Sequence, residues 1–194
     1  METSPEVCWY ALYTRPRHEK RVCEQLMEKQ IEAFLPLQRE IHRWKDRNKE
    51  VWLPLFTGYL FVHFRLQDRL KALQLPGAIR LVSANGRPTP IPDAELDSLR
   101  HALDSGIPLH KHGHLRVGRR VRVCRGALAG AEGILVRQKG GHRLILSIEL
   151  IQRSVSVEVD ATDVIPFAET TGKYAGAPPS AANPFGGMQL RIAR

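Results

Sequence analysis

The hydrophobic pattern of this chain changes once, close to residue 105, and this change constrains the fold more than any other feature. Before it, segments with helical spacing alternate with strand-forming segments. After it, from Val117 to Ile165, short runs of Val, Ile and Leu are separated by glycines and polar residues. Strands punctuated in this way are typical of a small antiparallel barrel. The sequence therefore predicts an α+β domain followed by an all-β domain.

The first part of the chain combines strands with amphipathic helices. Trp9 to Thr14 is rich in β-forming residues, and residues 17–30 then place apolar side chains at helical spacing. The nearly continuous apolar run from Tyr59 to Phe64 predicts a central strand that is covered on both faces. Residues 67–75 and 93–104 are expected to form two further helices. We expect a sandwich of helices on an antiparallel sheet.

Two extended segments in this part flank a polar stretch. Residues 33–41 and 51–56 are expected to be extended, and residues 43–50 between them suit an exposed hairpin or loop. The excess of Lys and Arg in this loop predicts that it can contact DNA.

We divide the chain into four parts on these patterns. Residues 6–104 are the first domain and residues 115–167 the barrel. Residues 105–114 contain Gly, Pro and His without a hydrophobic period, which predicts a linker. Residues 168–194 lack periodicity and are expected to be disordered.

The positive charge of the chain lies mainly in its second half. The formal net charge is +9; residues 1–104 carry 16 Lys and Arg against 14 Asp and Glu, and residues 105–194 carry 13 against 6. Between Lys111 and Arg143, nine basic residues are opposed by Glu132 alone. This stretch predicts a surface that faces nucleic acid, because Lys and Arg release counterions from phosphates. A solvated basic face is the alternative interpretation.

The cysteines, histidines and short motifs of this chain indicate no disulfide, metal site or catalytic site. Cys8, Cys23 and Cys124 form no C-x-x-C pair, and no apolar run approaches the roughly 20 residues of a membrane span. We expect a soluble cytoplasmic monomer with reduced thiols. His110, His112 and His114 occupy every second position, with no carboxylate nearby that could complete a metal site. The sequence signatures of nucleotide-binding loops, zinc proteases and serine hydrolases are absent. We expect no catalytic residue, no metal and no cofactor.

Several segments resemble the NusG family, including its specialised paralogues RfaH and the UpxY-type antiterminators. The resemblance spans roughly residues 8–167. Its marks are Trp9-Tyr10-Ala11-Leu12-Tyr13, Pro54-Leu55-Phe56-Thr57-Gly58-Tyr59-Leu60-Phe61-Val62, Pro88-Thr89-Pro90-Ile91-Pro92, Val117-Gly118-Arg119-Arg120-Val121-Arg122-Val123, and Gly126, Gly130 and Gly133-Ile134. It implies an N-terminal polymerase-binding domain and a C-terminal SH3-like KOW barrel. The implied function is regulation of pausing or termination during transcript elongation.

The resemblance also implies the binding residues. In the family the first domain docks on the clamp helices of the largest subunit of bacterial RNA polymerase; the matching residues are Tyr10, Tyr13, Leu55, Phe56 and Tyr59. Aromatic side chains with a polar edge are favoured anchors in such interfaces. Simple core packing is the alternative interpretation for each of them.

Basic residues after the first strand match the family surface that faces the non-template DNA strand. They are Arg15, Arg17, Lys20 and Arg21. Arginine can pair with phosphate and stack on bases, which suits non-template DNA or nascent RNA. A solvated helix face is the alternative.

For the barrel, the resemblance implies binding of the ribosome or the termination factor Rho. The candidate residues are Arg120, Arg122, Arg125, Leu128 and Ile134. Housekeeping members carry Phe where this chain has Leu128 or Ala131, and the family's Phe-Pro-Gly is Phe56-Thr57-Gly58 here. These departures favour a specialised paralogue, and antitermination in particular operons is the preferred role.

A further expectation concerns the barrel. In RfaH the second domain can refold into helices, but Val155-Ser156-Val157-Glu158-Val159 alternates and is β-branched, so we expect a permanent barrel.

The alternative function is an RNA-binding or ribosome-associated protein that uses its basic barrel without acting on polymerase. The first domain discriminates between the two functions. Binding of polymerase needs the aromatic residues of this domain at a surface, whereas binding of RNA by the barrel does not.

Overall fold

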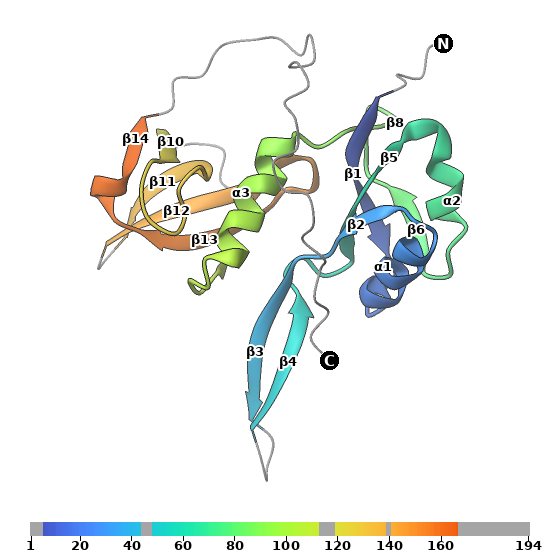
Figure 1. Ribbon diagram of the computed structural model, residues 1–194, viewed down its shortest axis with the longest axis horizontal. Coiled ribbons are helices and arrows are strands. Elements are labelled where there is room, and N and C mark those ends of the chain that lie inside the picture. The colour runs from blue at the N-terminus through green and yellow to red at the C-terminus, as the bar shows by residue number, and fades with distance from the viewer. Residues whose placement is uncertain (1–5, 44–47, 113–118, 139–140, 167–194) are drawn as a thin grey trace.

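The described residues form two larger sheets, with a helix between them. The structure is a computed structural model and describes residues 6–43, 48–112, 119–138 and 141–166. Helix α3 (Asp93–Asp104) lies between the sheets, and a two-stranded hairpin projects away from the first sheet (Figure 1). The predicted α+β fold with a second, all-β part is confirmed. No helix in the described ranges is long and apolar enough to cross a membrane.

The first sheet contains four antiparallel strands in the order β2-β5-β1-β6. Its strands are β1 (Val7–Thr14), β2 (Glu32–Phe34), β5 (Tyr59–Arg65) and β6 (Ala78–Leu81). The helices that follow β1 and β5 are α1 (Glu19–Glu28) and, after the 3-10 helix η1 (Leu66–Asp68), α2 (Arg69–Leu73). The helix predicted over 17–30 is shorter because Arg17 and Gln30 have φ angles of 66° and 58°, which no α-helix accommodates.

Side-chain alternation along β1 and β5 gives this sheet two different faces. Tyr10 and Leu12 pack in one cluster with Val22 and Leu26 of α1. Trp9 and Ala11 belong to a second cluster, which also contains residues of α3 and of the other sheet. Successive residues of a strand point to opposite faces, so Trp9 and Tyr10 necessarily belong to different clusters. The continuous apolar run of β5 is thereby explained, because both of its faces are covered.

Two hairpins interrupt this part of the chain. Strands β3 (Leu37–Arg43) and β4 (Asn48–Pro54) pair as the projecting hairpin, and β7 (Ser83–Ala84) and β8 (Arg87–Pro88) form a short one. Asn85 and Gly86 have positive φ at its turn, as two-residue hairpin turns require. The predicted extended segments are confirmed except at residues 35–36 and 55–56, which lie outside the strands. Residues 44–47 of the polar stretch lie outside the described residues.

The second sheet has six antiparallel strands in the order β14-β10-β11-β12-β13-β9. They are β9 (His110–His112), β10 (Arg119–Val123), β11 (Glu132–Gln138), β12 (Gly141–Ile148), β13 (Arg153–Val159) and β14 (Val164–Pro166), with 3-10 turns η2 (Glu149–Ile151) and η3 (Ala161–Asp163). Residues 155–159 are extended, as their alternation predicts. Strand β9 lies within the predicted linker and pairs with β13, because a sheet edge can pair with any backbone that reaches it. The predicted tail, 168–194, is outside the described residues.

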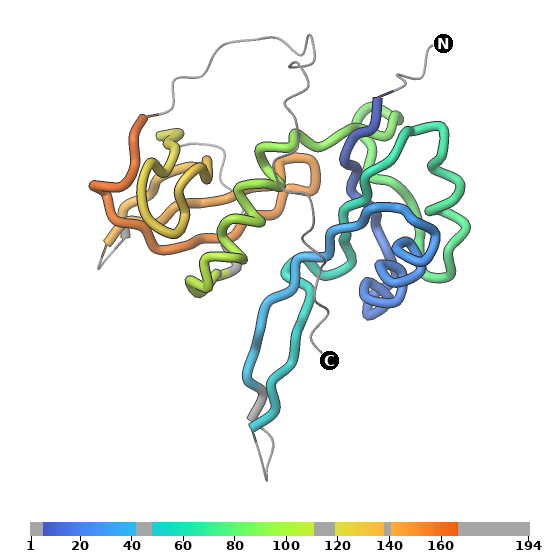
Figure 2. Tube along the Cα trace, viewed as in Figure 1, coloured from blue at the N-terminus to red at the C-terminus, as the bar shows by residue number. Residues whose placement is uncertain are grey.

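Helix α3 packs against the second sheet as well as the first. The backbone N–H of Glu132 donates to Ser98 Oγ at 2.9 Å, and the N–H of Glu149 donates to Glu95 Oε2 at 3.1 Å. On the side of the first sheet, the guanidinium of Arg100 lies over the ring of Trp9, 4.7 Å from its centroid. The helix therefore joins the two sheets through one shared core, as its position in Figure 2 illustrates.

Candidate functional site

Two tyrosines form a partly exposed corner of the first sheet. Tyr13 on β1 and Tyr59 on β5 are direct partners across the strands, and their ring centroids are 5.2 Å apart. Arg80 faces Tyr13 from β6, with its guanidinium carbon 5.7 Å from the ring centroid. Both tyrosines are half-buried and Arg80 is exposed. The corner thus offers two aromatic rings and a cation to a partner.

The turn beside Tyr13 fits closely against its ring. Gly58 has a φ of +81°, and a Cβ atom there would lie 3.1 Å from Tyr13 Cε2. The carbonyl of Gly58 accepts the N–H of Thr14 at 2.8 Å, and its N–H donates to Glu19 Oε1 at 2.7 Å. A glycine is needed here both for its backbone conformation and for space.

The four predicted nucleic-acid-binding residues lie on the loop after β1 and on the first turn of α1. Arg15, Arg17, Lys20 and Arg21 are all exposed. The N–H of Arg15 donates to the carbonyl of Gly77 at 2.8 Å, which ties this loop to the start of β6. Within the described parts of the chain, no carboxylate pairs with any of these four cations. The segment that carries the predicted basic residues therefore directly follows Tyr13, and it is tied through Glu19 to the turn that precedes Tyr59.

Three of the predicted polymerase-binding residues do not lie at this corner. Tyr10 is 5% exposed and stacks on Phe64 beneath the helices, with 5.3 Å between ring centroids. Leu55 and Phe56 are 2% and 4% exposed and belong to the core shared with α3 and the second sheet. The ring of Phe56 meets Phe61 edge-on. In this arrangement these three side chains pack the core, and a role for them in binding stays a prediction.

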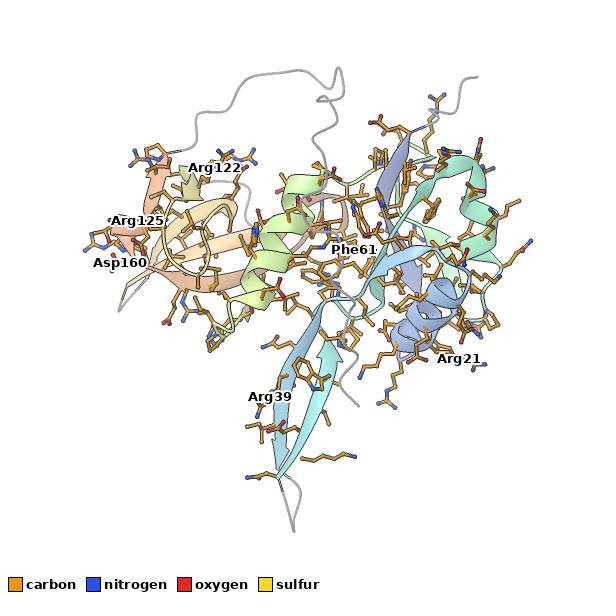
Figure 3. The ribbon with its side chains drawn as sticks, in the orientation of Figure 1. Arg21, Arg39, Phe61, Arg122, Arg125 and Asp160 are labelled. Atoms are coloured by element: carbon orange, nitrogen blue, oxygen red, sulfur yellow. The ribbon has the colours of Figure 1, made fainter. Side chains whose placement is uncertain are left out.

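The predicted residues of the barrel are likewise divided between surface and core. Leu128 and Ile134 are buried, and Leu128 belongs to the core shared with α3. Arg122 pairs with Glu132, and Arg125 donates to the carbonyl of Thr162 at 2.6 Å; Arg120 is exposed. The labelled Arg122 and Arg125 lie at the opposite side of the molecule from Arg21 (Figure 3). The two predicted basic surfaces are therefore separate.

Aromatic and charged groups also meet on the face of the first sheet that α3 covers. The guanidinium of Arg100 lies 4.9 Å from the ring centroid of Phe34, in addition to its contact with Trp9. His63 also stacks on Trp9, and its Nδ1 lies 2.7 Å from Glu32 Oε2. The hydrogen bond from His63 lowers the pKa of Glu32. The two contacts of Arg100 hold α3 on this face of the sheet.

Sequence reasoning missed Arg80, Glu19 and Arg100. Each of them acts through a contact between elements that are distant in the sequence, and the register of β1 with β6 carries no local signal. Among the described residues, no group of three or more His, Cys, Asp or Glu side chains is placed to hold a metal ion. The geometry of the corner suits binding of a protein surface and of phosphates.

Comparison with known proteins identifies the family. The family model described as "Transcription termination factor nusG" matches residues 7–100, which include the whole corner. The part of the chain from residue 7 to residue 100 belongs to the NusG family.

Relatives of this NusG-family chain extend the similarity beyond the matched residues. The transcription termination/antitermination protein NusG of Lactococcus lactis is 25% identical over 166 residues, which cover 78% of this chain and 89% of that protein. The protein with the same description from Helicobacter pylori is 24% identical over 173 residues, covering 78% and 93%. A solved structure described as "Domain interaction in Thermotoga maritima NusG" covers 84% of this chain and 98% of its own, with 18% identity and a TM-score of 0.49.

Proposed function

We propose that this NusG-family chain is a transcription factor that binds bacterial RNA polymerase during elongation and modulates pausing or termination. Tyr13 and Tyr59 would anchor the chain on the clamp helices of the largest subunit. Arg15, Arg17 and Lys20, together with Arg21, would contact the non-template DNA strand or the nascent RNA. The observation that carries the proposal is the half-buried pair Tyr13 and Tyr59, next in the chain to a loop and helix turn whose basic side chains are exposed.

The physical basis of the proposal is the composition of the corner. Tyrosines provide large contact area and a hydroxyl that tolerates water, and they are enriched among residues that dominate binding energy. Exposed arginines on the adjoining loop and helix can neutralise phosphates or stack on unpaired bases. One factor can therefore bridge polymerase and nucleic acid without any chemical step, and such a bridge changes the balance between paused and active states.

The burial of Phe56 limits which side chains can contact polymerase while α3 and the second sheet stay packed on the first sheet. Phe56 is 4% exposed in the core shared with α3 and the second sheet, so in the described arrangement its side chain is not available to polymerase. A contact through Phe56 as well would require α3 and the barrel to move away. The same movement would expose Leu128, which is among the predicted barrel contacts.

The regulatory role we propose is antitermination in particular operons, as a specialised member of the family. Its support is the replacement of the family's Phe by Leu128 or Ala131 in the barrel, where both residues are buried. The barrel would bind the ribosome or Rho through Arg120, Arg122 and their neighbours. Tethering of the two domains would raise the effective concentration of the second partner at the polymerase.

Single-round transcription by a bacterial RNA polymerase tests the proposal. Wild type should change pausing or terminator readthrough, and the Tyr13→Ala/Tyr59→Ala variant should lose most of this effect while keeping its circular-dichroism spectrum. Leu70→Ala is the matched control, because Leu70 is an exposed apolar side chain on α2, 57% exposed. Binding of RNA by the barrel, with no polymerase binding by wild type, would instead support the RNA-binding alternative.

A further inference from the structure

The carboxylate of Glu19 is buried, and no cation of the described residues pairs with it. Glu19 is the first residue of α1 and is 2% exposed, and among the described residues no Lys or Arg forms an ion pair with it. Its Oε1 accepts the backbone N–H of Gly58 at 2.7 Å. A buried charge is costly unless hydrogen bonds compensate it. The position at the positive end of a helix contributes to this compensation.

The glycine that Glu19 holds is the third residue of a tight turn. The N–H of Tyr59 donates to the carbonyl of Phe56 at 3.1 Å, which closes the four-residue turn 56–59. Gly58 has a φ of +81°, and Thr57 is not among the residues with positive φ, so the turn is of type II. Thr14 donates to the carbonyl of the same glycine at 2.8 Å. Both polar groups of Gly58 are therefore fixed.

We propose that Glu19 is a positioning residue, which holds the turn 56–59 so that Tyr13 and Tyr59 present one binding surface. The role rests on the proposed function of this corner. The ring of Tyr13 lies against Gly58, and Tyr59 is the last residue of the turn, so a shift of the turn moves both rings relative to each other. Because α1 also carries Lys20 and Arg21, Glu19 links the turn to the helix of the proposed nucleic-acid contacts.

A substitution within the turn can replace the contribution of Glu19. Position 57 is the second residue of a type II turn, where proline is favoured. The N–H of Thr57 makes no hydrogen bond with another described residue, so proline removes none. A proline that fits the native backbone stabilises a conformation about two- to fivefold by restricting the alternatives. Thr57→Pro should therefore restore order to a turn that has lost Glu19.

The experiment measures the affinity of the full-length chain for bacterial RNA polymerase in five forms: wild type, Tyr13→Ala, Glu19→Ala, Glu19→Gln and Glu19→Ala/Thr57→Pro. Glu19→Ala should bind about tenfold more weakly, since a hydrogen bond to a buried charge is lost. Glu19→Gln keeps an acceptor oxygen and should stay within about threefold of wild type. The double variant should bind about two- to fivefold more tightly than Glu19→Ala.

Hydrogen exchange of the Gly58 amide provides a readout that does not depend on polymerase. Exchange should be slow in wild type, faster in Glu19→Ala, and slow again in Glu19→Gln. Wild-type binding that is lost in Tyr13→Ala but unchanged in Glu19→Ala would overturn the positioning role and leave the proposed function intact. Weak binding that Thr57→Pro fails to improve would show that Glu19 serves only the stability of α1. Absence of binding by wild type would overturn the proposed function and the positioning role together.

Discussion

Replacing Glu95 with glutamine should stabilise this chain at pH 8, although the substitution removes a charged side chain. Burial between α3 and the second sheet raises the pKa of Glu95 from its ordinary value of 4.5 to about 7. The hydrogen bond from the Glu149 N–H and the charge of Arg120 lower it, whereas the charge of Glu149 raises it further. The folded state therefore prefers the protonated carboxyl, and a glutamine in its place never ionises.

The magnitude follows from the two pKa values. Between pH 4.5 and 7 the folded chain binds a proton that the unfolded chain has released, so stability is greatest below pH 4.5 and falls as the pH rises to about 7. One pKa unit corresponds to about 1.4 kcal/mol. From pH 5.5 to pH 8 the free energy of unfolding of wild type should therefore fall by about 2 kcal/mol more than that of Glu95→Gln.

Urea denaturation of both proteins at the two pH values measures this difference. Other titrating groups, including the histidines, are common to both proteins and cancel in the comparison. Glutamine retains a carbonyl oxygen that can accept the N–H of Glu149, so the contact itself is preserved. Equal pH dependence of the two proteins, or a wild type that gains stability relative to Glu95→Gln as the pH rises, would refute the reasoning.

Two further predictions concern the core and the thiols. Gly133→Ala should destabilise the chain by about 3 kcal/mol in thermal or urea unfolding, because its Cβ would overlap the backbone oxygen of Ile145. Gly86→Ala, where a Cβ meets no atom within 4 Å, should cost only the roughly 1–2 kcal/mol of a left-handed alanine; equal losses would contradict the crowding argument. Burial raises the pKa of Cys23 to about 11, so iodoacetamide at pH 8 should label the exposed Cys124 at least about 100-fold faster, as mass spectrometry would show. Comparable labelling rates would show that the site of Cys23 opens readily.

Periodicity predicted the elements of this fold because each of them has a local pattern. The alternation of residues 155–159 is found as part of β13, and the spacing in residues 17–30 as α1. The same rule could have separated Tyr10 from Tyr13 in advance, since residues three apart on a strand point to opposite faces. The resemblance to the family assigned Tyr10 and Tyr13 to one binding surface, whereas strand geometry places them on opposite faces of the sheet.

Contacts between distant elements explain what the sequence did not reveal. The apolar stripe of α3 predicts a buried helix, but it does not specify that Ser98 and Glu95 face the second sheet while Arg100 faces the first. Glu19 resembles an ordinary residue at the start of a helix until the fold brings Gly58 to it. Such pairings depend on which elements become neighbours, and no local propensity encodes them.

Photo-crosslinking from the corner tests the central claim most directly. A photoreactive phenylalanine analogue at Tyr13, and in a second variant at the exposed Arg137 of β11, would be irradiated in the presence of a transcribing bacterial polymerase. We expect position 13 to crosslink to the largest polymerase subunit, because Tyr13 lies at the proposed contact. Crosslinks to polymerase or RNA from position 137 alone, with none from position 13, would contradict the claim that the tyrosine corner binds polymerase.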